Sequence, residues 1–286
     1  MTLKSKIISL ISFSLFFSFL AAPAAFAFSF SSFDEPLKPY KKEDNQGKEQ
    51  IYNWYISLGL GESWSFASGH LGEDYVLRAQ KDVDGNNISK AEIGQPVYSI
   101  ADGTVFQVAD WPECGSGNHG WGGVVLIKHQ IPKDAGEKFN LAGTILLDPK
   151  AKDKKAEKKR VKKLEEKGTK VVYSMYGHLK NIPAKKGQLI KKGDKIGEIG
   201  DVCKRNSANK YSPHLHFEIK DQGAINGKGA DKKIDGIYGV GEGYSHIKNY
   251  APNRYIPSKF IENNKDLIIE EKPLVQKIKE KAAALY

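Results

Sequence analysis

The sequence has few cysteines. Only two occur among its 286 residues, which excludes a small disulfide-rich scaffold and a zinc ribbon held by four cysteines. Acidic residues are also fewer than basic ones, 34 against 44, so the formal net charge is +10. With 40% hydrophobic and 27% charged residues, the chain can bury a core and is not disordered as a whole. The length allows one or two domains, and the basic excess first indicates an anionic partner.

Charge is missing from a long stretch near the start of the chain. No charged residue follows Lys6 until Asp34, and residues 7–20 are mostly Ile, Leu, Phe and Ser. The stretch ends in Ala25-Phe26-Ala27. A basic start, an apolar run and a small-x-small end predict a secretory signal peptide over residues 1–27, with an uncleaved membrane anchor as the alternative. Export to the periplasm or the medium would exclude nucleic acid as a partner, and cleavage would leave no transmembrane span.

Short apolar runs, broken by Gly, Asn and Asp, fill the chain from about residue 51. They are of strand length and rich in β-branched or aromatic residues, which predicts a mostly β, compact antiparallel β-sheet domain over residues 67–262 with long inserted loops. The expected strands are 74–77, 96–100, 104–108, 124–127, 171–179, 195–199 and 214–219. A polar lead or linker segment, 28–66, precedes this domain, and a short helical tail, 263–286, follows it.

Residues 150–170 have almost no apolar side chains. They hold eleven Lys or Arg and four Asp or Glu, a net charge of +7. Such a segment cannot form a core strand, so we expect an exposed helix or a loop inserted between two strands. Once the signal peptide is removed, nearly all of the basic excess lies here. The insertion could hold the protein near an anionic envelope polymer or phospholipid headgroups, or it could be a solvated, solubilising segment.

Seven histidines occur, and four of them lie in short contexts that are typical of a metal site. His70 and Asp74 form an H-x-x-x-D pair within Gly69-His70-Leu71-Gly72-Glu73-Asp74. His178 follows Tyr176-Gly177. His214 and His216 form H-x-H, a spacing that places two imidazoles on the same face of a strand. Two imidazoles on one face can share a zinc ion, or one can bind zinc while the other works beside it.

Taken together and in this order, these pieces resemble the lysostaphin-type (LytM-type) zinc metallopeptidases, which cut peptidoglycan. The matching stretch covers about residues 68–220. Its pieces are His70-Leu71-Gly72-Glu73-Asp74, Gly94-Gln95-Pro96-Val97-Tyr98, Ala101-Asp102-Gly103-Thr104-Val105, Tyr176-Gly177-His178-Leu179, the segment 187–200, and Pro213-His214-Leu215-His216-Phe217-Glu218. The resemblance implies a compact antiparallel β-sheet domain with a groove above a metal ion.

The resemblance also implies roles for five side chains. It makes His70, Asp74 and His216 the zinc ligands, and His178 and His214 the catalytic pair that does not bind the metal. Three protein ligands leave a fourth position for water, as a catalytic zinc site requires. The sequence contains no H-E-x-x-H helix to supply a glutamate base, so an imidazole has to accept the proton. Which of His178 and His214 does so stays open at this point.

The remaining candidate residues have more ordinary interpretations. His129 ends an expected strand, where a structural role is expected. His119 and His246 lie in polar loops, and Trp111, Trp121 and Tyr211 either line the groove or pack in the interior. Cys114 and Cys203 both lie in extended loops, where an exported protein favours a disulfide over free thiols.

The function that these residues predict is zinc-dependent endopeptidase activity on the peptide cross-links of bacterial peptidoglycan. The alternative is a non-catalytic module of the same fold that binds or activates another cell-wall hydrolase. The sequence leaves open which peptide bond is cut and whether segment 28–66 packs over the groove.

Overall fold

The computed structural model describes most of the chain between residues 32 and 267. The described residues are 32–63, 68–77, 81–82, 85, 88, 91–111, 119–132, 135, 139–226, 234–235, 237, 239–241, 243–245 and 249–267. The predicted signal peptide and residues 268–286 of the predicted tail lie outside this range. Within the described residues, no helix has both the length and the apolar character needed to cross a membrane.

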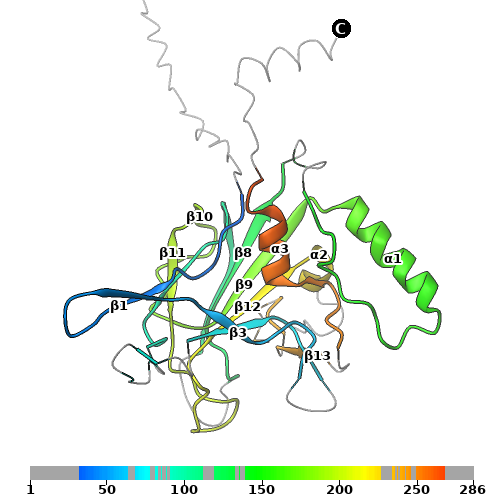
Figure 1. Cartoon of the computed structure of the whole chain (residues 1–286). Coiled ribbons are helices and arrows are strands. Elements are labelled where there is room, and N and C mark those ends of the chain that lie inside the picture. The colour runs from blue at the N-terminus through cyan, green and yellow to red at the C-terminus, as the bar shows by residue number, and fades with distance from the viewer. Residues whose placement is uncertain are drawn as a thin grey trace, which may run out of the picture.

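A ten-stranded antiparallel sheet forms the body of the molecule (Figure 1). Its main path runs β10-β7-β8-β9-β12-β5-β3, with β11 pairing β6 and β9, and β14 pairing β12. The bounds are β3 Tyr55–Leu58, β5 Glu73–Val76, β6 Pro96–Tyr98, β7 Gly103–Trp111, β8 Gly122–Gln130, β9 Val171–Lys180, β10 Leu189–Ile190, β11 Lys195–Ile199, β12 Leu215–Lys220 and β14 Arg254–Tyr255. The mostly β fold is confirmed, and each expected strand has a counterpart.

Side chains of the central strands alternate between two core clusters, one on each face of the sheet. On β8, Val125 and Ile127 belong to the first core cluster, together with Tyr176 and Phe217. Val124 and Leu126, their neighbours in sequence, belong to the second core cluster with Tyr173 and Met175. Because both faces are covered, these strands are apolar throughout rather than on every second residue.

The segment predicted as a lead or linker differs from that expectation. It contains a hairpin of β1 (Tyr40–Glu43) and β2 (Glu49–Tyr52), and then β3, which pairs with β5 at the edge of the main sheet. Phe33 is 1% exposed and packs edge-on against Phe260, with ring centroids 4.8 Å apart. A few apolar side chains, spaced among many charged ones, therefore tie this segment into the core, and the average polarity of the stretch conceals them.

Helices occupy the periphery of the sheet. They are α1 (Lys154–Lys167), α2 (Gln222–Ile225) and α3 (Pro257–Asn264). The α3 helix lies across the sheet, and α1 and the β1–β2 hairpin lie at opposite ends of the molecule (Figure 1). Glu73 of β5 caps α3 from outside the helix, because its carboxylate accepts hydrogen bonds from the Ser258 backbone N–H at 2.8 Å and the Ser258 hydroxyl at 2.7 Å.

The basic insertion forms a helix rather than an irregular loop. Asp153 caps α1 by accepting hydrogen bonds from the backbone N–H groups of Lys155 and Ala156, both at 2.9 Å. Val161 is buried against the body, whereas most of the remaining side chains face solvent.

Candidate metal centre

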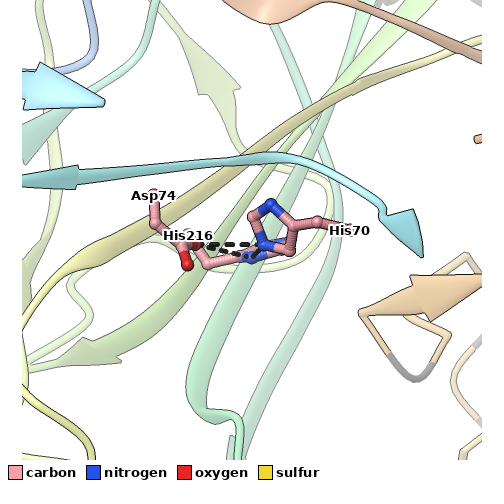
Figure 2. A group of neighbouring side chains, drawn as sticks. All are labelled: His70, Asp74 and His216. Carbon is pink, nitrogen blue, oxygen red and sulfur yellow. Dashed lines mark hydrogen bonds and ion pairs between the residues drawn. The ribbon is translucent and has the colours of Figure 1, made fainter. Parts of the chain in front are cut away.

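Three predicted ligands from two sheets meet at one point. His216 on β12 lies directly opposite Asp74 on β5 in the antiparallel register. His70 lies on β4 (Gly69–His70), which pairs with β13 (Tyr244–Ser245) in a separate two-stranded sheet. Figure 2 shows the three side chains converging, and all three are at most 9% exposed. Their ligand atoms lie within 4.8 Å of one another.

The distances between these atoms fit a small divalent cation. His70 Nε2 is 2.9 Å from His216 Nδ1 and 3.2 Å from Asp74 Oδ1, and His216 Nδ1 is 3.1 Å from Asp74 Oδ1. Zinc–nitrogen and zinc–oxygen bonds of about 2.0–2.1 Å at tetrahedral angles place neighbouring ligand atoms about 3.3 Å apart. Two imidazoles and one carboxylate are a donor set that zinc accepts, and three ligands leave a coordination position open. This donor set supports zinc as the cofactor.

Each ligand histidine is oriented through its second ring nitrogen. His70 Nδ1 lies 3.3 Å from the backbone carbonyl of Gly59, and His216 Nε2 lies 3.0 Å from Glu218 Oε1. Donation of these N–H groups leaves His70 Nε2 and His216 Nδ1 as the nitrogens that face Asp74. The hydrogen bonds thus select the ring nitrogens that remain for a metal ion.

Glu218, which orients His216, is held in turn by two cations. Its side chain is fully buried, Lys220 Nζ lies 3.0 Å from its Oε2, and Arg254 Nε donates to the same oxygen at 2.5 Å. Burial acts to raise the pKa of Glu218, but Arg254 and Lys220 outweigh it and hold the pKa well below the usual range. Glu218 is the last residue of the Pro213–Glu218 motif, and the motif by itself indicates no role for it. The alternation of β12 could have indicated one, because His216, Glu218 and Lys220 share a face.

A glycine makes room for this arrangement. A Cβ at Gly72 would lie 2.4 Å from the carbonyl oxygen of Phe217 and 2.9 Å from His216 Nε2. Only the absence of a side chain at position 72 therefore lets the loop between β4 and β5 pass so close to β12.

A bulge in β9 directs His178 toward the metal centre. Gly123 pairs with Leu179 and Val125 pairs with Tyr176, so Gly177 and His178 together lie opposite the single residue Val124. His178 has a φ of 60°, in the left-handed region that few residues other than glycine adopt. In a regular strand, residue 178 would point into the first core cluster with Tyr176. The bulge turns it to the opposite face, where its ring lies 6.1 Å from that of His216.

His178 and His214 face each other beside the three ligands. Their ring centroids are 4.4 Å apart, and His178 also stacks on Trp121 at 5.5 Å. His214 Nδ1 lies 2.7 Å from the Ser212 carbonyl, and its Nε2 lies 3.7 Å from Asp74 Oδ1. His178 Nδ1 is buried and has no hydrogen-bond partner among the described atoms. Burial is the main cause that lowers the pKa of both imidazoles, so both are neutral at pH 7.

These side chains line a pocket of about 250 Å³. Besides the five histidine and aspartate residues, its walls include Ser57, His119, Trp121, Lys204, Tyr211, Ser212 and Tyr244. Trp121 and Tyr211 were predicted as possible wall residues, whereas His119 was expected only in a polar loop. No sequence pattern indicates Ser57, Lys204 or Tyr244, because each lies outside the quoted motifs.

The other candidate residues lie elsewhere or outside the described residues. Trp111 packs on the second core cluster and donates a hydrogen bond to Asp235. His129 is fully buried and bridges the Asp102 carbonyl and the Ser174 hydroxyl at 2.8 and 2.7 Å, a structural position as expected. Cys203 is buried and is not a free thiol. Cys114, its predicted partner, and His246 lie outside the described residues, so the pairing itself stays a prediction.

Comparison with known proteins agrees with the class that this site indicates. Residues 142–228 match the family described as Peptidase family M23, so the resemblance to the lysostaphin-type metallopeptidases is confirmed over that segment. The match includes His178, His214 and His216, and the structure adds His70 and Asp74 to them. M23 peptidases are metallopeptidases of the peptidoglycan-hydrolysing kind. No curated protein matched the chain.

Solved structures of M23-type peptidases are similar to the chain at low identity. One is the catalytic domain of lysostaphin from Staphylococcus simulans, with 18% identity, a TM-score of 0.34, and 73% of this chain and 93% of that chain covered. A zinc-containing peptidase from Vibrio cholerae has 19% identity, a TM-score of 0.26, and coverage of 63% and 43%. A putative M23 peptidase from Pseudomonas aeruginosa has 16% identity, a TM-score of 0.29, and coverage of 66% and 44%. The chain thus spans less than half the length of the Vibrio and Pseudomonas proteins.

Proposed function

We propose that this chain is a zinc-dependent endopeptidase that hydrolyses peptide cross-links of bacterial peptidoglycan. The observation that carries the proposal is the division of five side chains around one pocket. His70, Asp74 and His216 offer three ligand atoms within hydrogen-bond distance of one another, while His178 and His214 stand beside them without joining the group. A purely structural zinc site would need a fourth protein ligand and no spare imidazoles.

The three ligand side chains and the two remaining imidazoles have separate tasks in this proposal. The chemistry that bound zinc supplies is Lewis acidity, which lowers the pKa of water from 15.7 to about 7 and polarises a carbonyl oxygen. His70, Asp74 and His216 hold the metal, and Glu218 and the Gly59 carbonyl fix the two rings. Trp121 and Tyr211 wall the pocket and limit the access of bulk water to it.

His214 is the better placed of the two imidazoles to accept a proton. Its Nδ1 donates to the Ser212 carbonyl, so the lone pair of Nε2 faces the pocket near Asp74. His178, neutral and adjacent, can then donate through a ring N–H to the developing oxyanion or to the leaving amine. A neutral imidazole can both accept and donate a proton near pH 7, which suits it to either step.

The alternative function is a non-catalytic module that binds or activates another cell-wall hydrolase. The presence of all five residues in one pocket favours the enzyme, because a module that only binds has no need for a neutral imidazole pair beside an open metal position. The proposal also includes export, with peptidoglycan as the substrate in the periplasm or outside the cell.

Mass spectrometry of isolated peptidoglycan, digested with and without a chelator, tests the proposal. We expect new muropeptides whose cross-links are cut, their loss on chelation, and their return when zinc is restored. Digestion that continues in the chelator, or an inactive protein that holds stoichiometric zinc and raises the activity of a second hydrolase, would contradict it. The masses of the new fragments identify the bond that is cut.

A further inference from the structure

The acidic and basic side chains of the α1 helix differ in what they contact. Residues 150–170 contain four acidic residues, and three of them bind backbone N–H groups. Asp153 caps the helix, Glu157 Oε1 accepts from the Asp148 backbone N–H at 2.9 Å, and Glu165 Oε1 accepts from the Gly143 backbone N–H at 2.9 Å. Only Glu166 lies among the outward lysines, 3.8 Å from Lys162. Three of the four acidic side chains therefore bond to backbone groups, and only Glu166 adds negative charge among the outward lysines.

The lysines occupy the opposite face of the same helix. At about 100° per residue, five of them fall within an arc of about 140°, centred away from buried Glu157 and Val161. They extend over about 12 Å of the helix axis. All five are exposed: Lys155, Lys158, Lys159, Lys162 and Lys163. We call these five residues the basic face.

Contacts with the body of the protein hold the helix that carries the basic face. Val161 is 6% exposed, and Glu157 is fixed by a bidentate ion pair with Arg160, both bonds 2.7 Å, in addition to its bond to Asp148. Side chains three and four residues apart on a helix lie about 5–6 Å from each other. Like charges at this spacing repel one another. An anion that neutralises several of the five lysines together therefore relieves this repulsion.

The side chains of the basic face distinguish between two kinds of anionic partner, a membrane surface and a hydrated polymer. A helix that settles into a membrane interface needs an apolar face for the acyl chains. Here Val161 is buried on the inward side beside Glu157, Leu164 lies near the same side although it is 39% exposed, and neither occurs among the five lysines. A lysine array without apolar neighbours suits a hydrated chain with repeated negative charges. The site pocket is lined by none of these residues.

We propose that the basic face of α1 binds a linear polyanion with closely spaced phosphate groups. This inference does not depend on the peptidase activity, because no residue of the basic face belongs to the metal centre. Binding of this kind holds an enzyme near a charged polymer without adding contacts at its active site, and it weakens as salt rises.

The test measures binding of the full chain to long-chain inorganic polyphosphate over a range of salt concentrations. The variant carries Lys158→Gln, Lys159→Gln, Lys162→Gln and Lys163→Gln, since glutamine keeps the helix propensity of lysine. We expect at least tenfold weaker binding at low salt. The slope of log K against log salt should fall by about 3, since each neutralised phosphate contributes about 0.7.

A control variant removes the same charge elsewhere. Lys48, Lys185, Lys186 and Lys265 are exposed and lie outside α1, and their replacement by glutamine should change affinity less than threefold. Arginine in place of the four helix lysines should retain binding, which separates charge from loss of folding. Equal losses in the glutamine variant and the control would overturn the proposal, as would wild-type binding to vesicles containing phosphatidylglycerol but not to polyphosphate.

Discussion

Nε2 of His216 lies 3.0 Å from Oε1 of Glu218, two residues further along the same strand. This contact assigns the nitrogen that remains for a metal ion, Nδ1, which lies 3.1 Å from Asp74. Burial alone would lower the pKa of His216, but hydrogen bonds to Asp74 and Glu218 raise it to about 9. Without a metal ion, His216 therefore carries a proton on Nδ1 as well as on Nε2. A metal ion that binds Nδ1 has to displace this proton, so Glu218 influences both the orientation of the ring and its affinity for cations.

Replacement of Glu218 by glutamine should weaken zinc binding by about 10- to 100-fold. The amide keeps the size of the side chain but removes the charge that orients His216 and offsets Lys220 and Arg254. A chelator competition titration measures the affinity. Glu198→Gln is the matched control, because Glu198 forms its contacts with Lys195 and Asn181 at the surface. An unchanged zinc affinity in Glu218→Gln, with a normal melting curve, would argue against the positioning role.

Removal of a ligand and removal of a catalytic imidazole should have different effects. His216→Ala should lose both zinc and hydrolysis, because two side chains do not make a zinc site of the required affinity. Zinc content by atomic absorption and digestion of isolated peptidoglycan are the two measurements.

His178→Ala should keep near-stoichiometric zinc and lose hydrolysis, by about 10²- to 10⁴-fold if it acts as a general acid or base. The same holds for His214→Ala. His119→Ala is the control, since His119 lines the pocket but its imidazole pairs with Asp235 at 2.7 Å. Unchanged turnover in His178→Ala would show that the assigned pair is wrong.

Protonation of His129 should destabilise the fold in mild acid. Burial lowers its pKa from 6.5 to about 4, so the unfolded chain binds this proton more readily than the folded one. The stability that depends on neutral His129 is complete above about pH 6.5 and is lost as the pH falls toward 4, by roughly 3 kcal/mol in all. Urea unfolding at pH 7 and pH 4.5 measures this loss.

The His129→Asn variant isolates that group, since asparagine keeps a hydrogen-bonding amide and does not titrate. It should be less stable than wild type at pH 7 but should show a smaller drop between the two pH values. His119→Asn, a change at a more exposed histidine, should leave the wild-type pH dependence intact. An equal drop in wild type and His129→Asn would mean that other groups cause the acid sensitivity.

The first described residues should matter for folding. Phe33→Ala should lower the free energy of unfolding by about 3–5 kcal/mol, because the ring is 1% exposed among Phe139 and Phe260. Ile51 lies on the hairpin and is 58% exposed. Ile51→Ala should therefore change the free energy of unfolding by less than about 0.5 kcal/mol. Denaturant midpoints give both values. A small effect at Phe33 would support the sequence-based interpretation of this segment as a lead or linker.

The sequence predicted the strands because they depend on local spacing, and the resemblance to a known family named the three side chains that the structure brings together at one point. The H-x-H spacing places His214 and His216 close together, with His216 on β12 and His214 just before it. The apolar runs of β8 and β9 are continuous enough to indicate burial on both faces. The helical alternative for residues 150–170 also agrees with the structure.

Other features depend on contacts between remote segments, which local spacing does not encode. Tyr244 reaches the pocket from the short strand β13 and Lys204 from a loop, both without a distinguishing pattern, and Phe33 joins the core from a stretch that is polar on average. The role of Glu218 depends on Arg254, which lies 36 residues away. The turn of His178 toward the metal centre depends on a pairing irregularity between β8 and β9 that composition does not reveal.

Because of the bulge in β9, the position of His178 depends on the number of residues in that strand. With one residue fewer between Tyr176 and Leu179, β9 could pair with β8 without interruption and form a more regular sheet. The imidazole at position 178 would then be lost from the metal side, although every ligand stayed in place. If the chain is the peptidase proposed above, a single-residue deletion in this strand should leave a metal-binding protein that folds and has no hydrolytic activity. Relatives that keep all three ligands but lack the extra residue are the ones in which to look for purely regulatory members.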